Sequence, residues 1–127
     1  MTYVGGGTND GDAISFTGNQ VFSQNSGARG DVPRIGVIIT DGGSSNPSLA
    51  VAAANKARTQ NIGLISVGVG NGVNMYELNN LADKPSSSNV FTVNSYENLD
   101  TITDNLIKQM CTSKWLMSSI QSCALLN

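Results

Sequence analysis

Residues 35–43, with the sequence Ile-Gly-Val-Ile-Ile-Thr-Asp-Gly-Gly, form a short apolar run that ends in a carboxylate and two glycines. A run that is apolar on both faces is typical of a strand in the middle of a sheet that helices cover on each side. Asp41 then comes at the carboxyl end of the strand, which is the edge where open α/β sheets bind ligands. Two interpretations of Asp41 stay open from this run alone: a side chain directed into a ligand crevice, or the first residue of a capping turn.

The next residues predict a helix and a second strand. Pro47 fits a first helical turn, and apolar residues then recur at helical spacing. The expected apolar face of this helix consists of Leu49, Ala50, Ala53, Ala54 and Ala57. Residues 62–70 are again apolar and end in glycine, and residues 90–93 predict a third strand. The order strand, helix, strand predicts an α/β fold with a mostly parallel sheet.

Further helices are predicted from cap residues and from apolar spacing. Thr8 or Asn9 is expected to cap a helix that continues to Phe22. Asn74 and Asn94 each precede a glutamate by three residues, which is the pattern of a capping box. We therefore interpret the two glutamates as helix starts and not as catalytic acids. The second box is expected to open the last regular helix, whose apolar face consists of Leu99, Ile102, Leu106 and Met110.

Composition excludes several classes of function. The net charge is −2 and there is no basic cluster, so we expect no nucleic-acid partner. No apolar run approaches the roughly 20 residues that a membrane-spanning helix needs. The sequence contains no histidine, which excludes Ser-His-Asp and Cys-His catalytic systems and His-containing zinc sites. The two cysteines, Cys111 and Cys123, could pair with each other, pair outside this chain, or remain thiols.

Two other motifs suggest binding. Glycines precede Thr8 at an expected helix start, where a phosphate could bind, but no lysine comes after them and Asp10 and Asp12 would repel an anion. Residues 29–31 are Arg29, Gly30 and Asp31, the tripeptide that integrins bind in some matrix proteins. A loop that leads into a buried strand is expected to carry glycine and charge in any case.

Four segments together resemble the von Willebrand factor A domain in their order and spacing. They are Gly-Gly-Thr-Asn at 6–9, Val-Ile-Ile-Thr-Asp-Gly at 37–42, Ile-Ser-Val-Gly-Val-Gly at 65–70, and a final helix that ends in Cys111. The resemblance implies a doubly wound α/β sheet with a metal-ion-dependent adhesion site at the carboxyl ends of its strands. It also implies that Thr8 and Asp41 are metal ligands there, with hard oxygens that suit Mg²⁺.

The family's first site motif, Asp-x-Ser-x-Ser, has no counterpart in this sequence. We therefore expect residues 1–111 to be a partial domain that lacks the first three strands, and residues 112–127 to be a tail. Mg²⁺ binding is then expected to be weak or absent. Cys111 resembles the cysteine that many members bond to one before their first strand, so a bond to Cys123 is only a fallback. The apolar strand at 35–40 is expected to lie at a sheet edge and to invite self-association.

The resemblance implies a non-enzymatic, extracellular adhesion domain that binds a matrix or cell-surface protein such as collagen. An intracellular scaffold is a second role open to a member of the family. A small nucleotide- or phosphate-binding enzyme of α/β fold is the alternative. It explains the glycine loops but not the absence of histidine, of the P-loop lysine and of a second carboxylate in the crevice.

Overall fold

The computed structural model describes residues 6–112 of the 127-residue chain. Three strands form one parallel sheet in the order β1 (Arg34–Thr40), β2 (Ile62–Val69) and β3 (Val90–Val93). The helices are α1 (Asp10–Phe16), α2 (Pro47–Thr59), α3 (Met75–Leu81), α4 (Ser86–Asn89) and α5 (Thr103–Thr112), with a π-helical turn η1 (Thr17–Val21) and 3-10 turns η2 (Gln24–Ser26) and η3 (Tyr96–Ile102). The predicted α/β class and all three predicted strands are confirmed. The predicted tail beyond residue 112 lies outside the described residues.

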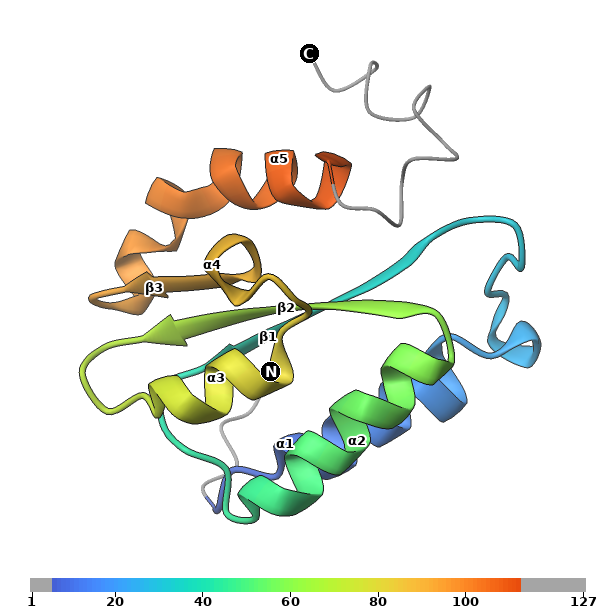
Figure 1. Ribbon diagram of the computed structural model, residues 1–127, viewed down its shortest axis with the longest axis horizontal. Coiled ribbons are helices and arrows are strands. Elements are labelled where there is room, and N and C mark those ends of the chain that lie inside the picture. The colour runs from blue at the N-terminus through green and yellow to red at the C-terminus, as the bar shows by residue number, and fades with distance from the viewer. Residues whose placement is uncertain (1–5, 113–127) are drawn as a thin grey trace.

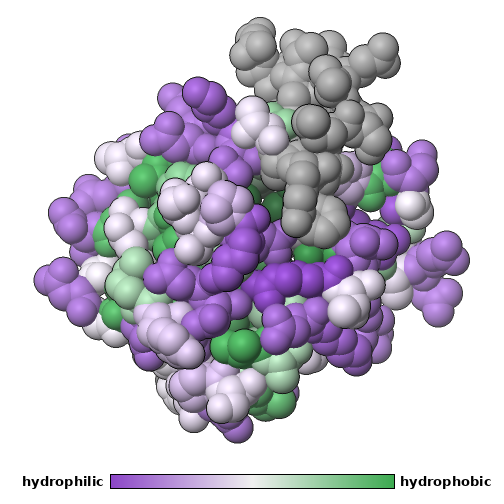
Figure 2. Space-filling model, viewed as in Figure 1, coloured by the Kyte–Doolittle hydropathy of each residue, from purple (hydrophilic) through white to green (hydrophobic). Residues whose placement is uncertain are grey.

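Helices lie on both sides of the sheet, as a doubly wound fold requires. Figure 1 shows α1, α2 and α3 on one side of the strands and α5 on the other. Every residue of β2 is buried, because this strand is paired on both edges and covered on both faces. In the part of the chain that the structure describes, no helix has the length and hydropathy of a membrane span. Hydrophilic residues cover much of the face seen in Figure 2, with hydrophobic residues scattered between them.

Strand β1 is one of the two edge strands of the sheet that residues 6–112 form. Among the described residues it pairs only with β2, in a parallel register that runs from Arg34 opposite Ile62 to Thr40 opposite Gly68. Most of β1 is half-buried, and Ile39 is 49% exposed. Its sequence is that of a central strand, but the position expected for a partial domain is confirmed. An apolar strand therefore presents unpaired backbone groups along one side.

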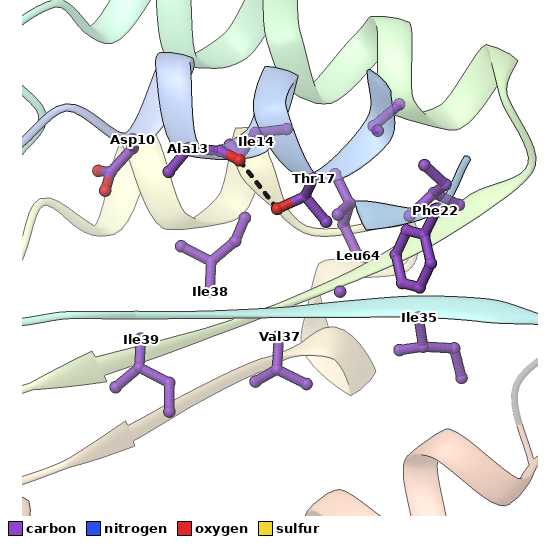
Figure 3. A pocket seen from close by; sticks show the side chains of 14 residues that line it. Asp10, Ala13, Ile14, Thr17, Phe22, Ile35, Val37, Ile38, Ile39 and Leu64 are labelled. Atoms are coloured by element: carbon purple, nitrogen blue, oxygen red, sulfur yellow. Dashed lines mark hydrogen bonds between the residues drawn. The ribbon is translucent and has the colours of Figure 1, made fainter. Parts of the chain in front are cut away.

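A cavity of about 340 Å³ lies between α1, η1 and β1. Figure 3 shows Ile38 directed toward α1, whereas Val37 and Ile39 point to the opposite side of the strand. Asp10 lies near one end of the cavity and Phe22 near the other. The free edge of β1 thus borders an apolar hollow that the described residues do not fill.

Helix α2 packs closely because its inner face is made of alanine. Four of its five alanines, Ala50, Ala53, Ala54 and Ala57, are buried, but Leu49, predicted on the same face, is 43% exposed. The neighbour is α1, where a Cβ on Gly11 would lie 2.9 Å from Leu49 Cγ and 3.1 Å from Ala50 N. Small residues on both helices permit this approach. Pro47 begins α2 as predicted, and Asn46 caps the helix, because its Oδ1 accepts from Leu49 N–H at 3.1 Å.

Two predicted helix starts differ from the structure. Asn9 is the residue before α1, but its side chain donates to Asp12 Oδ2 at 2.7 Å and forms no cap. The capping box at Asn94 is wrong. Ser95 precedes the helical segment there, and its carbonyl accepts from Asn98 N–H at 3.1 Å in a 3-10 turn. The predicted last helix is therefore two elements, the 3-10 segment η3 and the α-helix α5. No side chain caps the start of η3, whose turns are tighter than those of an α-helix.

Arg58 connects the end of α2 to the end of α3. Its Nε donates to Asp83 Oδ1 at 2.9 Å, and one terminal nitrogen donates to the carbonyls of Asn80, Leu81 and Ala82 at 3.0, 2.7 and 2.8 Å. The Asp83 side chain is 7% exposed. The guanidinium thus satisfies carbonyls that a helix end leaves unpaired.

We expect Arg58→Lys to lower the free energy of unfolding by about 1–3 kcal/mol, because an ammonium keeps the charge but cannot reproduce the planar fork. Urea denaturation monitored by circular dichroism measures this change. Arg29→Lys, in an exposed loop, is the matched control and should leave the midpoint unchanged. Equal midpoints for Arg58→Lys and the wild type would contradict this role.

Candidate functional site

Three loops meet beyond the carboxyl ends of β1 and β2. They are residues 6–9 before α1, residues 41–46 after β1, and residues 70–74 after β2, and together we call them the carboxyl edge. The first two are joined by a hydrogen bond from Ser45 N–H to the Thr8 carbonyl at 2.8 Å. The last two touch, because a Cβ on Gly72 would lie 3.0 Å from the Asp41 carbonyl oxygen. The parallel sheet therefore brings distant loops together, as predicted.

Asp41 is exposed at this edge, directly after β1. Its neighbour is Tyr96, at the start of η3. Burial, then the negative charge of Asp41 and a hydrogen bond with it, raise the pKa of the Tyr96 phenol above its usual value. Tyr96 was not predicted as a site residue, because in the sequence it falls within a capping-box pattern. Of the two interpretations of Asp41, an accessible carboxylate at the sheet edge fits better than a turn cap.

Thr8 lies on the opposite loop of the same edge and is half-buried. Its backbone is held to Ser45, and Gly7 permits the approach, since a Cβ there would clash with Ser45 Oγ at 2.6 Å. Within residues 6–112 the Thr8 hydroxyl makes no hydrogen bond. Thr8 and Asp41 are thus on contacting loops, which bring two hard oxygen groups to the same edge of the sheet.

Glu77 is a site residue that was not predicted from the sequence. Its side chain is buried, and both carboxylate oxygens accept from Ser44 N–H, at 3.1 and 3.0 Å. Asn74 Oδ1 does accept from Glu77 N–H at 3.3 Å, so that half of the predicted capping box is confirmed. The glutamate half is wrong, because the side chain holds the loop that carries Asp41 instead. No local pattern could show a contact between residues 33 positions apart.

Asp10 is a second carboxylate near this position. Its Oδ2 is buried and has no hydrogen-bond partner among the described residues. Burial, and then the negative charge of Glu77, raise the pKa of Asp10 above its usual value. A group of this kind binds protons more readily when the chain is folded, so its contribution to stability decreases as the pH rises above the ordinary aspartate pKa. The carboxyl edge therefore gathers negative charge.

The donor set at this edge fits a hard divalent cation only in part. No three acidic, cysteine or histidine side chains within residues 6–112 are placed to hold a metal ion. The Thr8 hydroxyl and the Asp41 carboxylate are the right chemical type for Mg²⁺, which binds oxygen and retains several waters.

The other predicted residues lie elsewhere. Arg29, Gly30 and Asp31 are exposed in the loop that precedes β1, at the end of the sheet opposite Asp41. Figure 1 shows this loop at the right, whereas the connection from β1 to α2 is at the left. Cys111, in the last turn of α5, is disulfide-bonded. Cys123 lies outside the described residues.

Residues 1–105 match the profile of the von Willebrand factor type A domain. The chain belongs to this family. The resemblance inferred from the four sequence segments is thereby confirmed.

Relatives of this von Willebrand factor A domain occur among matrix proteins. The chain is 35% identical to the collagen alpha-1(XXI) chain of Homo sapiens over 111 residues, which is 87% of this chain and 11% of the collagen. It is 32% identical to matrilin-1 of Gallus gallus over 114 residues, or 90% of this chain and 22% of the matrilin. The chain therefore spans a small part of the curated relatives that it matches.

Solved structures show the same fold. Proximal thread matrix protein 1 from the mussel byssus, in a form with a zinc-occupied MIDAS motif, superposes with a TM-score of 0.78 and 28% identity over 84% of this chain and 27% of that chain. The manganese-loaded TRAP protein of Plasmodium vivax gives a TM-score of 0.61 at 21% identity, over 83% of this chain and 42% of that chain. At this identity, the similarity to the TRAP protein shows a common fold only.

We expect Glu77→Ala to loosen the loop at 41–46, because Ser44 N–H loses its charged acceptor. The free energy of unfolding should fall by about 1–3 kcal/mol. Amide hydrogen exchange at Ser44 should accelerate. The pKa of Asp10 should move down toward its usual value, since a neighbouring negative charge is removed.

Glu97→Ala is the matched control, because Glu97 occupies the same position in the other Asn-x-x-Glu segment but is exposed. It should change none of these three quantities. Unchanged Ser44 exchange in Glu77→Ala would show that the glutamate does not hold the loop.

Proposed function

We propose that this chain is a non-enzymatic binding domain that attaches to an extracellular matrix protein through the carboxyl edge. The observation that carries the proposal is the exposed Asp41 carboxylate, on a loop that the buried Glu77 and the Thr8 backbone both hold. A carboxylate held by neighbouring loops but open to solvent is suited to binding and not to stabilising a core. The kinship with collagens and matrilins supports a matrix partner and an extracellular location.

A bound magnesium ion is part of this proposal. Thr8 and Asp41 would hold Mg²⁺, which, when bound, would supply a positive charge able to accept an acidic side chain of the partner. Two protein oxygens offset only a small part of the free-energy cost of removing water from Mg²⁺. Binding of Mg²⁺ by this chain alone is therefore expected to be weak. The zinc-occupied motif of the mussel matrix protein supports a divalent cation at the equivalent edge of a related fold. We propose residues 1–111 as the domain and residues 112–127 as a tail.

The alternative, a nucleotide- or phosphate-binding enzyme, has less support. The first turn of α1 carries Asp10 and Asp12, and the pKa of Asp10 is already raised by burial and by the charge of Glu77. An added phosphate would increase that repulsion. The chain also contains no histidine. A thermal shift on adding nucleotide would favour the enzyme.

The test of the proposal is retention of the full chain on a collagen-coated surface. We expect retention to increase with added Mg²⁺ and to disappear with EDTA. Asp41→Ala should abolish the metal-dependent part. Thr8→Ala should weaken it and leave the free energy of unfolding nearly unchanged, because Asn9 and not Thr8 precedes α1. Asp104→Ala, which removes an exposed carboxylate on α5, is the control and should bind as the wild type does. Retention that EDTA does not change would contradict the metal-dependent proposal.

We also propose that the free edge of β1 causes self-association. The strand is apolar, its outer backbone groups are unpaired, and it borders the cavity of about 340 Å³. Such edges pair with other chains unless a charge or a proline interrupts them. The partner in this case would be a second copy of the same strand.

Val37→Lys should therefore convert associated chains to monomers, because it places a charge in the middle of β1. Sedimentation velocity over a range of concentrations measures the change. Val21→Lys is the control, since Val21 is 49% exposed and belongs to η1, not to the strand. A wild-type chain that stays monomeric throughout the concentration range would disprove self-association.

A further inference from the structure

The loop between η2 and β1 presents three exposed residues, Arg29, Gly30 and Asp31. Gly30 and Asp31 form a turn, and Arg29 directly precedes it. Neither Arg29 nor Asp31 makes an ion pair or a side-chain hydrogen bond with any of residues 6–112. A loop charge that only maintained the fold would be expected to contact a helix end or an opposite charge. These two charges are therefore available to a partner.

Gly30 is not required by the fold. Its backbone is outside the left-handed region, and a Cβ built on it would meet only Gln24 Nε2, at 4.0 Å. By contrast, Gly27 in the same loop has a φ of 84°, a conformation that favours glycine. The backbone conformation thus explains why residue 27 is glycine, whereas nothing in the loop requires glycine at residue 30. A partner whose surface lies against the backbone between the two charges would require a residue without a side chain there.

The loop is held at both ends. On one side, Ala28 N–H donates to the Ser23 carbonyl at 3.1 Å, and the Ser23 hydroxyl oxygen accepts from Ser26 N–H at 3.3 Å. On the other side, Arg34 enters the sheet opposite Ile62. The short segment between these anchors has a restricted spread of conformations, which lowers the entropic cost of binding. The charged pair is therefore presented on a constrained turn.

We propose that Arg29, Gly30 and Asp31 form a second binding site, which takes an integrin-type cell-surface receptor. Such a receptor would pair the guanidinium with acidic groups and accept the carboxylate at its own divalent cation. The site lies at the opposite end of β1 from Asp41, and the strand alone separates the two by roughly 20 Å. The two partners would thus not compete. The domain would link a matrix protein at the carboxyl edge to a cell at the other end of the sheet.

The test is attachment of integrin-bearing fibroblasts to wells coated with the full chain. We expect wild-type attachment to be blocked by a soluble Arg-Gly-Asp peptide and not by an Arg-Gly-Glu peptide. Asp31→Glu keeps the charge but moves it by one methylene, and Gly30→Ala adds one methyl group. Each should raise the half-maximal coating concentration about tenfold or more, since a lost contact to a charged group has that effect on affinity. Both variants should unfold at the wild-type urea midpoint, because neither position is constrained by the fold.

Asp104→Glu makes the same chemical change on exposed α5 and should leave attachment unchanged. Absence of attachment to wild-type chain, or equal attachment to Asp31→Glu, would overturn the proposal. Attachment that is lost in Asp41→Ala but kept in Asp31→Glu would assign cell binding to the carboxyl edge and would overturn it as well. The result is independent of matrix binding, since Asp31→Glu should still be retained on collagen as the wild type is.

Discussion

The parallel pairing of β1 with β2 is the constraint on which the rest of the structure depends. Seven residue pairs, from Arg34 opposite Ile62 to Thr40 opposite Gly68, align the ends of the two strands. Since parallel strands point the same way, the loops after them leave at one edge, and the loop that precedes β1 is at the other. This register places Asp41 against Gly72 and keeps Arg29 to Asp31 away from both.

Two charged side chains then connect the helices to this sheet. Arg58 joins the end of α2 to carbonyls at the end of α3, and Glu77 joins the start of α3 to the loop before α2. Glu77 is buried and Arg58 is half-buried, and both are compensated by hydrogen bonds, as burial of charge requires. Because they act at opposite ends of α2 and α3, they fix the two helices relative to each other. The loop that carries Asp41 is positioned as a result.

The two ends of the sheet have different chemistry. Asp41 lies on the carboxyl edge, and Glu77 accepts from Ser44 N–H in the same loop. Burial together with the charge of Glu77 raises the pKa of Asp10, which follows the loop at 6–9. The mussel matrix protein, which has a similar fold, carries zinc in its MIDAS motif. The other end carries an uncompensated pair of opposite charges on a short loop. The two proposed binding sites therefore differ in charge and lie at opposite ends of the sheet.

The amino-acid sequence by itself determined the fold class, the three strands and the start of α2, because apolar periodicity and cap residues are local patterns. It also identified Asp41 and Thr8 as a candidate pair. Only the tertiary structure showed that the loops carrying these two residues contact other loops of the same edge. It also showed the roles of Glu77 and Tyr96, both of which lie in predicted capping boxes. Only the tertiary structure decided that Leu49 is exposed and that Gly30 is unconstrained. The physical reason is that these properties depend on contacts between residues far apart in the chain, which no periodicity records.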